Sequence, residues 1–161
     1  MLIRAAPLIE VREGGNQRYV KLKEFGGNRN LTMGMDDLST EYMIAALQKR
    51  ELPHLPAHEA LNTCLQCLQG NIEKLVVYGL VDGRFKSQMT LRDQRDDRTY
   101  GVEVNVIDGI IIALVGGCPI FVVEEVFKQS NDMLEILARD FFTAQAQMVF
   151  DHLDIKRERK M

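Results

Sequence analysis

The sequence predicts a single α+β domain with a mixed or antiparallel sheet of about seven strands, about four helices and a long C-terminal helix. Segments with the two-residue periodicity of strands, separated by glycine turns, alternate with segments of helical periodicity. The 161 residues are enough for one domain that buries roughly two thirds of its unfolded surface. We therefore expect an α+β domain over residues 1–130. An amphipathic helix over residues 131–161 is expected to pack on that domain or at a subunit interface.

Three strands and a helix are predicted in the N-terminal part of the chain. Pro7–Arg12 and Arg18–Glu24 have strand character on either side of a glycine turn, and Leu31–Met35 alternates as a third strand. A helix is expected from about Leu38 to Arg50, because side chains that favour N-caps come directly before it. The N-cap candidates are Asp36, Asp37 and Ser39.

The middle of the chain predicts a second helix followed by a hairpin. The helix covers about Ala57 to Gln69 and stops at a glycine. Asn71–Val81 is an apolar strand, and Asp82-Gly83 turns the chain into the alternating strand Arg84–Leu91.

The segment Gly101–Val126 allows two interpretations of its middle. A strand that ends near Val106 is followed by Asp108-Gly109 and an apolar block. Asp-Gly between hydrophobic runs favours a hairpin, and successive isoleucines favour a strand. Alternatively, Asp108 caps a short buried helix, Ile110–Val115, that ends at a glycine in the left-handed conformation. Propensity by itself leans slightly to the hairpin.

This segment resembles the signature of the bifunctional nuclease (BFN) domain family, a family of small domains long classed as of unknown function. In that family a strand leads into Arg-Pro-Ser-Asp-Ala-Ile, an apolar helix, Gly-Ala-Pro-Ile-hydrophobic-Val and two acidic residues. The resemblance extends over about Pro7–Gln129 through Leu31–Met35, Leu55–Glu59 and Val81–Phe85, and it implies the helical interpretation. The matching signature positions are Asp108, Ile110, Ala113, Leu114, Gly117, Pro119, Ile120, Val122, Glu124 and Glu125.

The chain departs from the family pattern directly before Asp108. The family's Arg-Pro-Ser falls on Asn105, Val106 and Ile107. Arginine and serine beside a helix N-terminus would form an anion site, which a short neutral amide and an isoleucine do not replace. If phosphate binding in the family depends on those groups, this chain binds phosphate more weakly.

His58 and Glu59 are the first candidates for catalytic chemistry. They open the second predicted helix, and an imidazole beside a carboxylate is suited to general base or metal-ligand roles in phosphodiester hydrolysis. The family resemblance makes His58 the best single candidate. In the structural alternative, Glu59 interacts favourably with the helix dipole and His58 packs or caps locally.

Asp108 is the second candidate. Capping a helix would explain it fully, whereas a role in activating water or holding Mg²⁺ requires further oxygen ligands. Glu103, on the preceding strand, and Glu124, after the next strand, are the residues that could supply them. We therefore expect the catalytic set His58, Asp108 and Glu59, with a possible Mg²⁺ site of Glu103, Asp108 and Glu124.

Cysteine usage and hydropathy indicate a cytoplasmic protein without a membrane span. The chain has three cysteines without a framework spacing, and no run of about 18 apolar residues. Cys64 and Cys67 fall inside a predicted helix rather than at its N-terminus, so we expect core packing rather than a redox pair.

The net charge of −3 argues mildly against strong non-specific binding of nucleic acid, because phosphate neutralisation supplies most of that affinity. DNA or RNA is nevertheless the partner that the resemblance implies. Apolar residues off the main stripe of the C-terminal helix, Phe142, Val149 and Phe150, favour a homodimer.

The resemblance implies a nuclease that hydrolyses phosphodiester bonds in DNA or RNA. The alternative is a catalytically silent oligomeric binding or regulatory module that retains the BFN fold. The acidic net charge and the missing arginine and serine favour this alternative.

Overall fold

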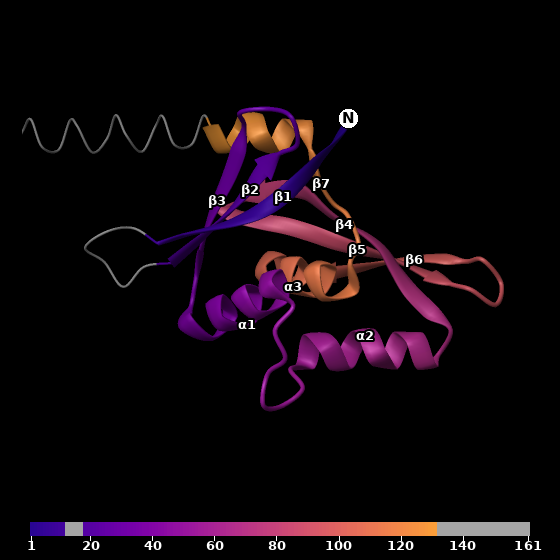
Figure 1. The fold of residues 1–161 in the computed structure, drawn as a ribbon. Helices are drawn as coiled ribbons and strands as arrows, with labels where there is room; N and C mark the ends of the chain where they lie inside the picture. The colour runs from indigo at the N-terminus through magenta and orange to yellow at the C-terminus, as the bar shows by residue number, and fades with distance from the viewer. Residues whose placement is uncertain (12–17, 132–161) are drawn as a thin grey trace, which may run out of the picture. The chain divides into compact units, whose positions relative to one another are not determined.

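One mixed sheet of seven strands organises the molecule, in the order β3-β2-β1-β7-β4-β5-β6 (Figure 1). The computed structural model describes residues 1–11 and 18–131. The sheet and its helices confirm the predicted α+β class. The strands are β1 (Leu2–Val11), β2 (Arg18–Glu24), β3 (Asn30–Met35), β4 (Gly70–Val81), β5 (Arg84–Asp93), β6 (Thr99–Val104) and β7 (Ile120–Val123).

Strand pairing is antiparallel throughout the sheet except between β4 and β7, which run parallel. The parallel pair arises because the chain passes through β5, β6 and a helix before it returns beside β4. β1 pairs with β2 on one side and with β7 on the other. The two outer strands of the sheet are β3 and β6.

The pairing register gathers the apolar side chains on one face of the sheet. Met89 of β5 lies opposite Leu75 of β4 and Val102 of β6, and Leu75 lies opposite Ile120 of β7. Directly paired residues point to the same side, so these four residues share a face. In Figure 1 the helices α1, α2 and α3 lie on one side of the sheet.

The first two helices follow the sequence prediction closely. α1 (Asp37–Gln48) begins after Asp36, whose carboxylate accepts a hydrogen bond from Ser39 N at 2.6 Å. That bond lowers the pKa of Asp36, because it favours the ionised form. α2 (Ala57–Cys67) has no side-chain cap at its N-cap residue, Pro56.

The third helix confirms the helical interpretation but corrects its start and its cap. α3 (Val106–Gly116) begins four residues earlier than the predicted Ile110, since the chain leaves β6 directly into a helical turn. Asn105, and not Asp108, is the N-cap. Asp108 lies within the first turn, where its own N–H is one of the groups that need capping. The helix ends at Gly117 in the left-handed conformation (φ 68°).

Cys64 and Cys67 are exposed, so the prediction that they pack in the core is wrong. The reason is that α2 buries none of its residues fully, although its sequence has apolar periodicity.

The chain is helical again over residues 124–131, and Phe127 is fully buried. The predicted helix over 131–161 and its Phe142, Val149 and Phe150 interface lie, apart from residue 131, outside the described residues. None of the helices in the described ranges has the length and apolar character needed to cross a bilayer.

Candidate functional site

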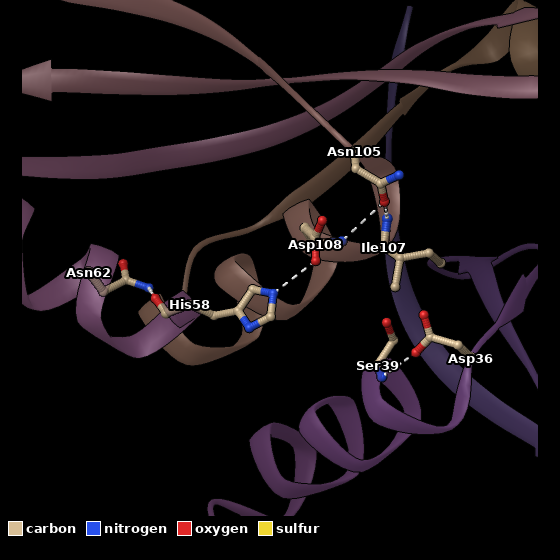
Figure 2. A network of polar contacts seen from close by, with 7 residues as sticks. All are labelled: Asp36, Ser39, His58, Asn62, Asn105, Ile107 and Asp108. Atoms are coloured by element: carbon tan, nitrogen blue, oxygen red, sulfur yellow. Dashed lines mark hydrogen bonds and ion pairs between the residues drawn. The ribbon is translucent and has the colours of Figure 1, made fainter. Parts of the chain in front are cut away.

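His58 and Asp108 meet between α2 and α3. His58 Nε2 lies 2.9 Å from Asp108 Oδ1, across a sequence separation of 50 residues (Figure 2). Because an ionised carboxylate only accepts hydrogen bonds, the imidazole donates through Nε2. The structure thus brings together two of the three residues predicted to be catalytic.

The two partners differ strongly in access to solvent. The His58 side chain is only 12% exposed, whereas the Asp108 side chain is 51% exposed. The edge of the His58 ring packs against Tyr42 of α1, with ring centroids 5.6 Å apart and planes at 67°. His58 Nδ1 is buried and has no hydrogen-bond partner in the described part of the chain. Asp108 is therefore the member of the pair that a substrate or a water molecule can reach.

Asn105 caps the backbone N–H groups at the start of α3, beside Asp108. Asn105 Oδ1 accepts hydrogen bonds from Ile107 N at 2.9 Å and Asp108 N at 3.4 Å. With the backbone groups capped by the asparagine, the Asp108 carboxylate is free to turn toward α2, as Figure 2 shows. The neutral side chain that replaces the family's arginine thus has a structural role.

Asn62 joins the same two helices one turn further along α2. Its Nδ2 donates to the carbonyls of His58 and Ile112, each at 3.3 Å. Gly116 leaves room for this contact, because a Cβ there would lie 2.8 Å from Asn62 Oδ1. The position of α2 against α3, and with it the His58–Asp108 contact, is held by side chains of both helices.

Glu59 does not join the pair, although it follows His58 directly in sequence. Consecutive helical residues point about 100° apart, and Glu59 lines a separate pocket of about 370 Å³ between α1, α2 and α3. Tyr42 lines this pocket from the His58 side. Lys49 and Arg50 also line it, and neither has an ion-pair partner among the residues that the structure describes.

Glu103 and Glu124 are engaged elsewhere. Glu103 accepts a hydrogen bond from the Tyr78 hydroxyl, and this bond raises the pKa of Tyr78. Glu124 accepts one from Arg29 at 3.3 Å. The structure therefore does not gather these two carboxylates around Asp108.

The donor set in the described ranges does not fit an Mg²⁺ ion held by the protein alone. No three His, Cys, Asp or Glu side chains of that part of the chain lie close enough to share an ion. Mg²⁺ requires several oxygen ligands at about 2.1 Å in octahedral geometry, and Asp108 supplies a single carboxylate there.

The three helix N-termini near the pair differ in how they are capped. Figure 2 shows Asp36 as the N-cap of α1, His58 in the first turn of α2 and Asp108 in the first turn of α3. Each N-terminus carries roughly half a positive charge, which attracts anions. The N-terminus of α2 has no side-chain cap, so its backbone N–H groups remain available to an anion.

Sequence reasoning missed Asn105, Asn62 and Tyr42 as parts of the site. Asparagine is among the best N-cap residues, so its place before an apolar helix was a signal that could have identified the Asn105 cap. No sequence signal marks Asn62 or Tyr42, because both act through contacts between helices.

Two relatives match at low identity. The uncharacterized protein MT1877 of Mycobacterium tuberculosis (strain CDC 1551 / Oshkosh) is 25% identical over 123 residues, or 76% of this chain and 72% of that protein. The uncharacterized protein Rv1829 of Mycobacterium tuberculosis (strain ATCC 25618 / H37Rv) has the same identity and coverage. The bifunctional nuclease domain matches residues 20–135, which include His58, Asp108 and the strands and helices that carry them. With more than half of its length matched, this chain belongs to the bifunctional nuclease domain family.

Proposed function

We propose that the protein hydrolyses phosphodiester bonds in DNA or RNA, with Asp108 as the general base and His58 as a positioning residue. The observation that carries the proposal is the 2.9 Å contact between a buried imidazole and an exposed carboxylate. A hydrogen bond from Nε2 fixes one carboxylate oxygen, so the other is left for a water molecule. This arrangement resembles a base oriented by a second group, which is a recurring device in hydrolysis.

The chemical step follows from this assignment. Asp108 accepts a proton from water while the water oxygen forms a bond to phosphorus. The P–O ester bond breaks, and the leaving alkoxide takes up a proton from solvent. His58 acts through Asp108 rather than on the substrate, because its Nδ1 is buried.

Substrate binding in this proposal relies on groups next to the pair. The uncapped N-terminus of α2 is suited to a phosphate, and Lys49 and Arg50 in the neighbouring pocket are suited to the phosphates that flank it. These groups compensate in part for the phosphate binding lost where Asn105 replaces the family's arginine.

A nuclease assay on the purified 161-residue protein, with single-stranded DNA and RNA, tests the proposal. Asp108→Asn is the central variant, since the amide oxygen still accepts from His58 Nε2 but cannot act as a base. We expect kcat to fall by about 10²- to 10⁴-fold with an unchanged melting temperature. Wild-type activity in Asp108→Asn would refute the assignment.

The role of His58 is tested by comparing two substitutions. His58→Ala removes the donor to Asp108, whereas His58→Gln offers an amide donor in its place. We expect kcat to fall less in His58→Ala than in Asp108→Asn, and to be partly restored in His58→Gln. If His58→Ala abolishes activity and His58→Gln restores none of it, His58 itself performs the chemistry.

Glu103→Gln distinguishes catalysis by the His58–Asp108 pair from catalysis by a metal ion that Glu103, Asp108 and Glu124 would share. Glu103 bonds to Tyr78 and lies outside the pair, so we expect normal activity in this variant and no dependence on added Mg²⁺. Strong loss in Glu103→Gln together with inhibition by EDTA would favour the metal site.

The second candidate function is a catalytically silent binding or regulatory module. The replacement of Arg-Pro-Ser by Asn105, Val106 and Ile107 favours it, as does the Asn105 cap, which makes these residues part of the helix frame. This candidate gains support if the wild-type protein cleaves no DNA or RNA with any divalent ion.

A further inference from the structure

β6 is an outer strand of the sheet (Figure 1), and its apolar side chains remain exposed. Tyr100 and Val102 lie opposite Leu91 and Met89 of β5, so they are on the core face of the sheet. Nevertheless Tyr100 is 49% and Val102 is 40% exposed. The part of the chain that the structure describes thus leaves the core face uncovered along β6.

The opposite edge of the sheet is different. In β3 the core-face residues Leu31 and Met33 are buried. Natural edge strands are commonly protected by lysine, proline or a bulge, but neither outer strand contains lysine or proline, and both pair with their neighbours without a register shift. Burial is what separates the two edges: of the described outer strands, β6 is the one whose core-face side chains Tyr100 and Val102 are exposed, so we take it as the edge open to pairing.

The backbone of β6 offers hydrogen-bonding groups outward in a regular row. Asp93 N donates to Arg98 O at 2.8 Å, so alternate residues starting at Arg98 turn their backbone groups toward β5. Thr99, Gly101 and Glu103 consequently present their N–H and C=O groups to the open side. Within the described chain, β6 has β5 as its sole strand neighbour.

We propose that a second copy of this chain pairs antiparallel with β6, around a two-fold axis at Gly101. In this register Tyr100 lies opposite the partner's Val102, and Thr99 lies opposite the partner's Glu103. Tyr100 and Val102 form non-hydrogen-bonded pairs, in which side chains on one face approach most closely. An aromatic residue beside a β-branched residue is a favourable cross-strand pair.

Self-complementarity favours a second copy over an unrelated strand. The residues with outward backbone groups pair with one another, so every outward donor meets an acceptor. Glu103 lies opposite a threonine rather than another glutamate, so like charges do not face each other. The partner's Arg98 lies opposite Val104 and keeps its ion pair with Asp96 at 3.2 Å, so no charge is left facing a like charge along the paired segment.

Multi-angle light scattering over a dilution series tests the proposal. We expect a dimer that dissociates on dilution, and a monomer at every concentration for Val102→Lys, since a lysine on the paired face disrupts edge pairing. Gly34→Lys on β3 is the matched control, because Gly34 is exposed and an added Cβ there meets no atom within 4 Å. A wild-type monomer throughout, or a Val102→Lys dimer with unchanged affinity, would overturn the proposal.

Disulfide cross-linking tests the register even if Val102→Lys does not fold. Gly101→Cys, with Cys64 and Cys67 changed to Ser and Cys118 to Ala, places one thiol on the two-fold axis. Directly hydrogen-bonded antiparallel residues have Cα atoms about 5.5 Å apart, within disulfide range. The three atoms nearest to the new Cβ all belong to the flexible Gln88 side chain, the closest being Nε2 at 2.4 Å, so Gln88 has to change its rotamer. We expect a cross-linked dimer under mild oxidation and none from Gly34→Cys; equal cross-linking of both would contradict the proposed interface.

Discussion

His58 of α2 donates a hydrogen bond to Asp108 of α3 at 2.9 Å, and this contact joins two residues that are 50 positions apart in sequence. The histidine is nearly buried and the aspartate is half exposed. The nearly buried imidazole therefore holds the half-exposed carboxylate of Asp108 in place at the surface. Its geometry rests on the Asn105 cap and on Asn62, which connects the same helices.

The Asn105 cap is expected to stabilise the fold and to position Asp108. Asn105→Ala should lower the free energy of unfolding by about 1 kcal/mol, because it leaves the N–H groups of Ile107 and Asp108 without their acceptor. Asn105→Asp retains the acceptor and is the matched control. Urea denaturation measures both variants, and equal stability of Asn105→Ala and wild type would show that the cap is energetically unimportant.

Gly109→Ala is expected to destabilise the core. A Cβ at this position would lie 2.8 Å from Leu75 Cδ1 and 3.0 Å from Val104 Cγ1. Leu75 is fully buried and cannot move aside, so overpacking should cost about 1–3 kcal/mol, more than the gain of about 1 kcal/mol in helix propensity. Thermal and urea unfolding of Gly109→Ala, with Gly34→Ala as a control in open space, checks this expectation. A more stable Gly109→Ala would contradict the packing of α3 on β4.

The three thiols are expected to differ in reactivity. Burial raises the pKa of Cys118 to about 11, so its thiol remains protonated and unreactive at pH 8. Cys64 and Cys67 are exposed. Timed alkylation followed by mass spectrometry should show two fast modifications and a slow one at Cys118, whose rate rises steeply as the pH approaches 11. Equal rates for all three at pH 8 would contradict the burial of Cys118.

Lys49 and Arg50 are expected to contribute to substrate affinity if the proposed nuclease function holds. Each phosphate contact on a single strand contributes about 0.7 to the slope of log K against log salt. Lys49→Ala and Arg50→Ala should each weaken binding of single-stranded DNA and reduce this slope by about that amount. Arg84→Ala, an exposed cation on the β4–β5 turn, is the control. Fluorescence anisotropy at several salt concentrations measures the slopes. Equal slopes for all three variants would show that Lys49 and Arg50 do not contact the bound DNA.

Much of the fold could be predicted from local pattern. β2 has the predicted bounds, and the β4–β5 turn lies at Asp82-Gly83 as expected, because both depend on periodicity and turn chemistry within a few residues. The family resemblance correctly replaced a hairpin with the helix α3, where propensity alone leaned the other way. The start and the cap of that helix were misplaced, since Asp108 and Asn105 are both good cap residues and the choice between them sets where the helix begins.

The candidate site was only partly predictable. His58 and Asp108 were both predicted as catalytic residues, together with Glu59, and Asp108 was also predicted to share a metal ion with Glu103 and Glu124. The direction of a side chain depends on helix phase and on neighbouring elements. As a result Glu59 points to another pocket, while Glu103 and Glu124 bond to Tyr78 and Arg29.

The sequence by itself determined the order and type of most strands and helices, the family, and the residue types available for chemistry. The tertiary structure decided that His58 meets Asp108, that the metal-ligand carboxylates stay apart, and that Cys64 and Cys67 are exposed. The physical reason is the range of the forces involved. Periodicity and capping act within one helix or strand, whereas the site depends on how α2 packs against α3 across 50 residues of chain.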